Sequence, residues 1–144
     1  MPEGSKVTTY REMKSDKFSM KSRLASFRYA FSGLRTLLKN EHNSRIHIAA
    51  TIVAITAGII FKLDLQEWCL IMLVIGIVFI TELLNSALEA LADHVEPGMN
   101  DLIGKAKDYS AAAVLISAII ALITGLLIFF PKLIHLLHIS PSIR

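Results

Sequence analysis

The chain has 144 residues, enough for one domain, and 53% of them are hydrophobic. Its mean hydropathy of +0.55 excludes an ordinary soluble fold of this length. The single cysteine excludes a framework of intramolecular disulfides. Although the net charge is only +3, ten of the 15 Lys and Arg residues lie within residues 1–45. This basic arm is typical of contact with an anionic membrane surface, and because no nucleic-acid-reading element follows it, we expect no nucleic-acid partner.

The N-terminal region is expected to contain a flexible polar extension, residues 1–22, and then a helix that ends near Asn40. From Phe18 onward, apolar side chains recur at spacings of three and four, at positions 27, 31, 34 and 38. Cations occupy the other faces, so the pattern predicts an amphipathic helix that lies on the membrane surface. The alternative is a helix packed on a soluble core, but the chain has little soluble core to offer.

Three apolar stretches follow, at about 46–63, 68–92 and 111–130. Each is close to the ~20 residues that cross a bilayer as a helix. The fold class is therefore an all-α membrane protein, with one surface helix and three transmembrane helices in a domain of residues 23–133, followed by a short tail, 134–144. The cations before the first stretch predict a cytoplasmic N-terminus, and three crossings then place the 93–110 connection in the cytoplasm.

The second stretch carries polar residues on one face. Glu82, Asn85, Ser86, Glu89 and Asp93 step by three or four along a helix, apart from one adjacent pair. An ionised carboxylate that faces lipid costs a few kcal/mol, so this stripe should face protein, water or a cation. Hydrogen bonding between helices is an alternative that accounts for the amide and the hydroxyl. It accounts poorly for two glutamates that repel each other.

Other charged residues are expected at the same cytoplasmic end, namely Glu41, Lys107 and Asp108. Carboxylates beside a lysine suit Mg²⁺ together with a phosphate, which suggests a nucleotide. Glu82 lies roughly 8 Å deeper, at 1.5 Å per residue, where it is a plausible general base for a lipid hydroxyl. The glycine-rich phosphate motifs GxxxxGK[ST] and GxGxxG are absent. The residues alone therefore leave open a small transporter or channel that uses the stripe as a cation site.

Three segments resemble one family. ELLNSALEALAD, residues 82–93, is similar to the ExxNxxxExxxD signature of the small prokaryotic integral-membrane lipid kinases, the diacylglycerol kinases and undecaprenol kinases. KAKDYSAAAVLIS, 105–117, and RYAFSGLRTLLKNEHNSRIHIA, 28–49, resemble two further segments of that family, in the same order. The loop at 96–101 departs from the family's nucleotide-contacting loop, and Ser22 stands where the family has an arginine, so neither is assigned a role.

The resemblance implies a homotrimer in the bacterial cytoplasmic membrane that phosphorylates undecaprenol or diacylglycerol with Mg-ATP. It places the catalytic base at Glu82 and the metal ligands at Glu41 and Glu89. The nucleotide contacts that it implies are Tyr29, Asn85, Glu89, Lys107 and Asp108. Asp93 and Ser86 are expected to support the site, and Arg35 and Arg45 to meet lipid headgroups. Because the carboxylates gather at one membrane face instead of forming a relay across it, the kinase is favoured over the transporter.

Overall fold

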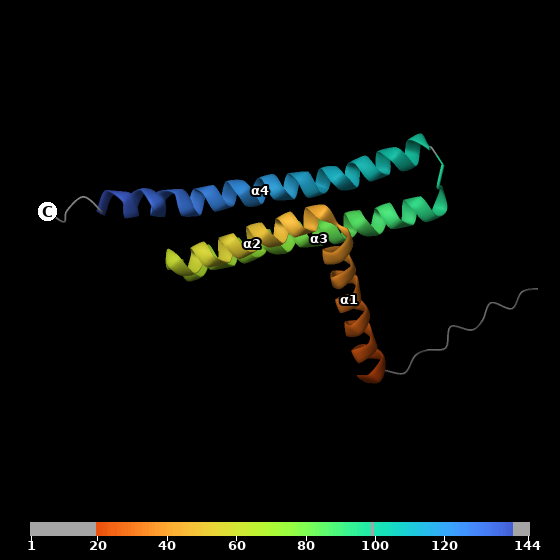
Figure 1. Cartoon of the computed structure of the whole chain (residues 1–144), viewed down its shortest axis with the longest axis horizontal. Helices are drawn as coiled ribbons and strands as arrows, with labels where there is room; N and C mark the ends of the chain where they lie inside the picture. The colour runs from red at the N-terminus through yellow and green to blue at the C-terminus, as the bar shows by residue number, and fades with distance from the viewer. Residues whose placement is uncertain (1–19, 99, 140–144) are drawn as a thin grey trace, which may run out of the picture. The chain divides into compact units, whose positions relative to one another are not determined.

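The computed structural model describes residues 20–98 and 100–139, and the regular structure within them is entirely helical. The helices are α1 (Met20–Asn40), α2 (His42–Ile60), α3 (Leu65–Val95) and α4 (Asp101–Ile139) (Figure 1). The chain forms two compact units, Met1–Ser32 and Gly33–Arg144, and α1 begins in the first and ends in the second. The all-α fold predicted from the sequence is confirmed. The expected flexible extension lies outside the described residues, apart from its last three.

Within the first unit, α1 exposes the large side chains Leu24, Phe27 and Phe31. In the second unit the last part of α1 buries Leu37. The helix stops because Glu41 is extended, with φ −91° and ψ 122°, and α2 begins at the next residue. The predicted helix before the first span is therefore present, and a single extended residue separates it from α2.

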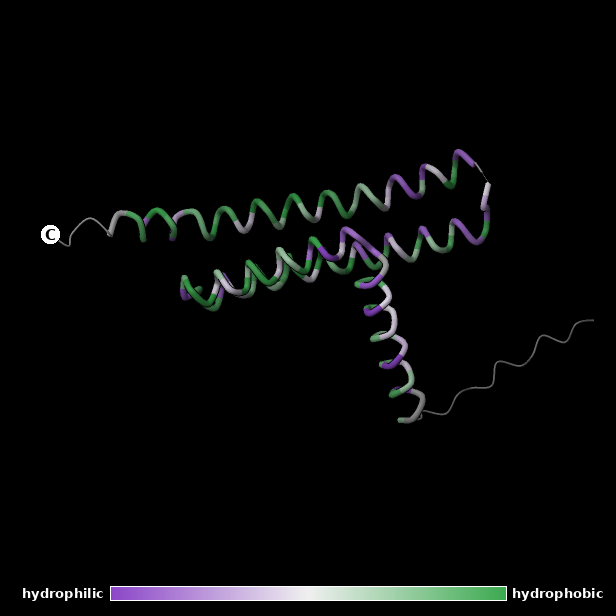
Figure 2. Tube along the Cα trace, viewed as in Figure 1, coloured by the Kyte–Doolittle hydropathy of each residue, from purple (hydrophilic) through white to green (hydrophobic). Residues whose placement is uncertain are grey.

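Three helices, α2, α3 and α4, are long and apolar enough to cross a membrane. Within the second unit α3 packs along α4, and α2 packs against α3. Most large apolar side chains of these helices remain exposed on the single chain. Figure 2 shows hydrophobic residues along the helices and hydrophilic residues gathered at the α3–α4 connection. This distribution is that of an integral membrane protein with one polar end.

The turn between α2 and α3 is closed by a Schellman motif. Leu63 N–H donates to the Gly58 carbonyl at 3.0 Å, and Lys62 N–H donates to the Ile59 carbonyl at 3.2 Å. Lys62 has a φ of 52°. This value lies in the left-handed region, which the motif requires and which residues other than glycine rarely adopt. The motif satisfies the last carbonyls of α2 and reverses the chain.

Three further contacts stabilise the end of the second unit at which this turn lies. Asp64 and Glu67 form a capping box at the start of α3, with both hydrogen bonds at 2.9 Å. Glu67 also forms an ion pair of 2.9 Å with Lys132 of α4. The Trp68 ring lies over Gly58, where an added Cβ would come within 2.7 Å of it. These contacts join α2, α3 and α4 at this end.

Helices α3 and α4 extend beyond their predicted spans at both ends, whereas α2 begins before its predicted span and ends at Ile60, three residues short of the predicted limit. The expected connection at 93–110 is mostly helical, because α3 continues to Val95 and α4 begins at Asp101. Asn100 accepts hydrogen bonds from the backbone N–H groups of Leu102 and Ile103, which begins α4 ahead of its apolar stretch. At its other end α4 continues past Pro131 to Ile139, so the described part of the expected tail is helical. The length of an apolar stretch reflects the thickness of the membrane. The helix itself can continue past that stretch, because its backbone hydrogen bonds do not depend on the polarity of the side chains.

Candidate active site

The polar stripe of α3 continues the apolar face by which this helix packs. Ile71, Val74 and Val78 are buried at spacings of three and four, and the next position of the same face is Glu82. Because Glu82 shares this face, its carboxylate lies in the packed interior beside α2 and α4. Of the predicted stripe, Glu82 is buried, Asn85, Ser86 and Glu89 are half-buried, and Asp93 is exposed.

Glu82 is 2% exposed. Its Oε1 atom accepts a hydrogen bond of 3.2 Å from the hydroxyl of Ser44, a fully buried residue of α2. Its Oε2 atom is buried and has no hydrogen-bond partner within the described residues. Buried carboxylate oxygens are normally satisfied, so an acceptor without a partner at this position is unusual.

Asn85 and Glu89 lie one and two turns further along the stripe. Asn85 Nδ2 donates to Glu89 Oε1 at 2.9 Å. On the other side of the amide, Ser110 Oγ of α4 lies 2.7 Å from Asn85 Oδ1. The amide therefore links a hydroxyl of one helix to a carboxylate of another. Ser86 is close by in sequence, and its buried hydroxyl has no hydrogen-bond partner in the described part of the chain.

Asp93 and Lys107 join the polar ends of α3 and α4. Lys107 Nζ lies 2.8 Å from Asp93 Oδ1, and both side chains remain partly or largely exposed. The hydrogen bond and the charge of Asp93 raise the pKa of the Lys107 ammonium above its ordinary value, and the charge of Glu89 adds to the shift. Lys107 precedes the predicted third span. It is therefore a fixed cation near the Glu89 carboxylate.

Two cavities contain most of the predicted site residues. A cavity of about 280 Å³ is lined by Glu82, Asn85 and Glu89 of α3 and by Asn43 and His47 of α2. The structure thus brings together the predicted base Glu82, the predicted nucleotide contact Asn85, and Glu89, which was predicted both as a metal ligand and as a nucleotide contact.

The second cavity, of about 580 Å³, lies at the α3–α4 connection. It is lined by Asp93, Asn100, Lys105, Lys107 and Asp108, among others. Four of the five nucleotide contacts predicted from the sequence are therefore divided between the two cavities, with Asn85 and Glu89 in the first and Lys107 and Asp108 in the second.

The remaining predicted residues lie outside both cavities. Glu41 is the N-cap residue of α2, but its side chain makes no capping hydrogen bond. Tyr29 is exposed on the part of α1 that belongs to the first unit, and Arg35 is exposed on the part that belongs to the second. Arg45 donates one guanidinium hydrogen bond of 2.7 Å to the carbonyl of Lys39, which caps the end of α1.

No group of three or more His, Cys, Asp and Glu side chains able to hold a metal occurs within residues 20–98 and 100–139. Mg²⁺ usually takes only one or two protein carboxylates and completes its shell with phosphate oxygens and water. Glu89 lies at a cavity with one oxygen bonded to Asn85, and the Glu41 carboxylate is not used in capping. Of the two predicted metal ligands the structure therefore brings only Glu89 to the Glu82 cavity, and a single carboxylate there is compatible with Mg²⁺ when a nucleotide supplies further oxygens.

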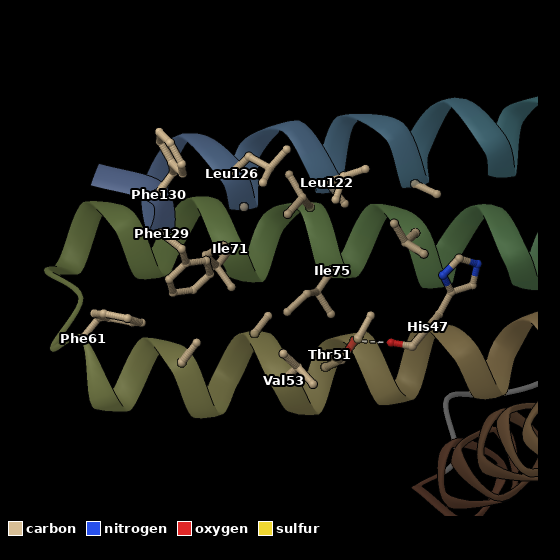
Figure 3. A pocket seen from close by; sticks show the side chains of 18 of the residues that line it. His47, Thr51, Val53, Phe61, Ile71, Ile75, Leu122, Leu126, Phe129 and Phe130 are labelled. Carbon is tan, nitrogen blue, oxygen red and sulfur yellow. Dashed lines mark hydrogen bonds between the residues drawn. The ribbon is translucent and has the colours of Figure 1, made fainter. Parts of the chain in front are cut away.

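An apolar groove adjoins the Glu82 cavity. It has a volume of about 520 Å³ and is lined by side chains of α2, α3 and α4. His47 and Ala118 line both the groove and the Glu82 cavity, so the two are adjacent. Figure 3 shows His47 at one end of the groove and Phe61 with Phe129 near the other, where the two rings are 6.1 Å apart. The groove therefore runs from the carboxylate along the apolar part of the helices.

Four lining or bonding residues were not predicted: Asn43, Ser44, His47 and Ser110. Asn43, Ser44 and His47 lie on the first turns of α2, and the position of His47, four residues after Asn43 and three after Ser44, was a usable signal that they share a face. Ser110 belongs to the segment that resembles the family, but its contact with Asn85 depends on the register between α3 and α4. Sequence periodicity does not give that register.

Comparison with known proteins identifies the family. The profile described as prokaryotic diacylglycerol kinase matches residues 28–129. An undecaprenol kinase of Bacillus subtilis (strain 168) is 40% identical over 108 residues, which is 75% of this chain and 88% of that protein. A diacylglycerol kinase of Synechocystis sp. is 37% identical over 115 residues, 79% of this chain and 66% of that one. A diacylglycerol kinase of Escherichia coli (strain K12) is 36% identical over 96 residues, which is 67% of this chain and 79% of that protein. The chain therefore belongs to the prokaryotic diacylglycerol kinase family and is an integral-membrane lipid kinase.

Proposed function

We propose that this protein transfers the γ-phosphate of ATP to the hydroxyl of undecaprenol or diacylglycerol, with Glu82 as the general base. The observation that carries the proposal is the Glu82 carboxylate, which is 2% exposed and leaves Oε2 without a partner in the described residues. A lipid hydroxyl that reaches this atom would find an acceptor shielded from water. The matching family and the names of the relatives supply the reaction class.

The proposed proton transfer is simple. The lipid hydroxyl gives its proton to Glu82 Oε2 while its oxygen forms a bond to the γ-phosphorus, and the bond from that phosphorus to ADP breaks. Ser44 holds the other carboxylate oxygen at 3.2 Å, which orients Oε2. Positioning and charge stabilisation supply most of the acceleration in phosphoryl transfer.

The nucleotide would bind at the polar end of α3 and α4. Lys107, held by Asp93 at 2.8 Å, offers a cation to the phosphates, and Asp108 lines the same cavity. Glu89 and Glu41 would hold Mg²⁺, whose charge would offset that of the phosphates. Asn85 and Tyr29 are proposed as further nucleotide contacts.

The hydrocarbon chain of the acceptor would lie in the apolar groove. The groove adjoins the Glu82 cavity, with His47 and Ala118 in both linings, and runs along the membrane helices. An acceptor bound there would have its hydroxyl at the carboxylate and its tail in the bilayer. Arg35 and Arg45, both exposed, would meet neighbouring headgroups.

The working assembly is proposed to be a homotrimer in the cytoplasmic membrane, with the N-terminus and the site on the cytoplasmic side. The cations concentrated before α2 favour this orientation. In one chain Glu82 lies in a cavity bounded by only three helices, and most apolar side chains of those helices are uncovered. Other copies would enclose the site.

The experiment that tests the proposal is transfer of labelled γ-phosphate by the purified protein in mixed micelles. Undecaprenol and diacylglycerol are offered separately, with and without Mg²⁺. Label on either lipid that requires Mg²⁺ supports the kinase and names the acceptor. No label on either lipid, combined with ion flux through reconstituted vesicles, would favour the transporter instead.

A further inference from the structure

Ser110 is a buried hydroxyl at the site that the proposed chemistry does not use. It is 8% exposed and lies on α4, three residues after Lys107. Its Oγ atom is 2.7 Å from Asn85 Oδ1 and 2.8 Å from the carbonyl oxygen of Lys107. Asn85 Nδ2 in turn donates to Glu89 Oε1 at 2.9 Å. Hydroxyl, amide and carboxylate thus form one continuous chain of hydrogen bonds between α4 and α3.

Hydrogen-bonding chemistry fixes the direction of this chain. An ionised carboxylate only accepts, so the NH₂ group of Asn85 must face Glu89. The amide oxygen then faces Ser110 and needs a donor, and the hydroxyl has a single hydrogen to give. If the amide were reversed, its oxygen would face the Glu89 carboxylate, and two acceptors would oppose each other. The contact of Ser110 with the Lys107 carbonyl competes for the same hydrogen.

We propose that Ser110 is a positioning residue for phosphoryl transfer, because it locks the Asn85 amide in the orientation that holds Glu89 Oε1. The other carboxylate oxygen of Glu89 makes no hydrogen bond to the described part of the chain and is left for the metal. Ser110 touches neither metal nor nucleotide in this scheme and acts through Asn85. The inference rests on the proposed function, since it assigns Glu89 to Mg²⁺.

A purely structural role is the competing explanation, and the chain contains a serine that has that role. Ser117 of α4 is 4% exposed, donates to the Val114 carbonyl at 2.8 Å and shares a hydrogen bond of 2.9 Å with Thr81. It therefore joins the same two helices by the same kind of contacts, but neither of its hydrogen bonds within the described residues involves an acidic side chain. Replacing each serine by alanine removes an equivalent contact between helices.

The experiment compares Ser110→Ala, Ser110→Thr and Ser117→Ala in the full chain. Mn²⁺ binding is measured by electron paramagnetic resonance in the presence of a non-hydrolysable ATP analogue, and the Mg²⁺ concentration for half-maximal phosphate transfer is measured in parallel. We expect Ser110→Ala to weaken Mn²⁺ binding about fivefold and to raise the half-maximal Mg²⁺ concentration by about the same factor, the size of one lost hydrogen bond. Ser110→Thr, which keeps the hydroxyl, and Ser117→Ala should both stay within about twofold of the wild type.

Each contrary outcome has a distinct meaning. If Ser110→Ala and Ser117→Ala bind Mn²⁺ equally, or if Ser110→Thr is as weak as Ser110→Ala, the positioning role is wrong and Ser110 only joins helices. If the positioning role is wrong but the wild type transfers phosphate normally, the proposed function stands without a role for Ser110. A wild type that neither binds Mn²⁺ with the analogue nor transfers phosphate overturns the proposed function, and this inference with it.

Discussion

Glu82 is surrounded by protein although it lies in a helix that crosses a membrane. Its carboxylate is 2% exposed, one oxygen is held by Ser44, and the other has no partner in the described residues. The position of Glu82 on the packing face follows from its spacing to Val78 and could be predicted from the sequence. The hydrogen bond from Ser44 could not, because it depends on where α1 ends and α2 begins.

Replacing Ser44 by alanine tests this hydrogen bond. A hydrogen bond to a charged group contributes about 1.5–3 kcal/mol. We expect Ser44→Ala to lower the turnover number by about tenfold or more and to leave the KM for ATP nearly unchanged, because Ser44 orients the base and not the nucleotide. Steady-state kinetics at saturating lipid provide the measurement. Ser117→Ala is the matched control, since it removes a buried hydroxyl whose hydrogen bonds are with Val114 and Thr81 and not with Glu82. An unchanged turnover number in Ser44→Ala would show that Glu82 is oriented by other groups.

At the scale of the elements, the type and order of the helices follow from hydrophobic periodicity, and the existence of three apolar helices was predictable for that reason. The residues at which the helices begin and end could not be predicted in the same way, since the expected connection at 93–110 contains the first turns of α4. Gly58, Gly76 and Gly125 lie on the membrane helices, where small residues can permit close contacts between helices. Only Gly58 has such a contact within the chain, against Trp68, whereas an added Cβ at Gly76 or Gly125 would meet nothing within 4 Å.

This difference between glycines predicts opposite effects of the same substitution. Gly58→Ala places a methyl group 2.7 Å from the Trp68 ring, and overpacking of this kind costs about 1–3 kcal/mol. Gly76→Ala adds a methyl group in open space and removes a flexible residue from a helix, so it should leave stability unchanged or raise it by up to about 1 kcal/mol. Thermal unfolding of both variants in the same detergent provides the measurement. Equal stability of the two variants would mean that Trp68 moves away from Gly58 at little cost.

At the scale of the whole molecule, one chain leaves its membrane helices largely uncovered. The most apolar 18-residue windows of α2, α3 and α4 are only 11%, 22% and 6% buried. Lipid can cover such surfaces, but the polar residues beside Glu82 also need enclosure, since unsatisfied polar groups are costly in a membrane. The family resemblance implied a trimer, and the sequence of one chain gave no physical means to derive the number of copies.

Native mass spectrometry of the protein released from detergent tests the assembly. We expect a predominant mass of three chains. A predominant monomer under conditions that preserve activity would contradict the trimer and would require one chain to form the complete site.

The central claim is that the buried Glu82 carboxylate accepts the proton of the lipid hydroxyl, and the most direct measurement is the turnover number of Glu82→Gln. Glutamine keeps the shape of the side chain but cannot act as the base. We expect a loss of at least about a hundredfold, within the range typical of general-base catalysis, with native folding and nucleotide binding preserved. Glu67→Gln, the same change at the opposite end of α3, is the control and should retain nearly full turnover. A near-normal turnover number in Glu82→Gln would contradict the account and would move the base to another residue.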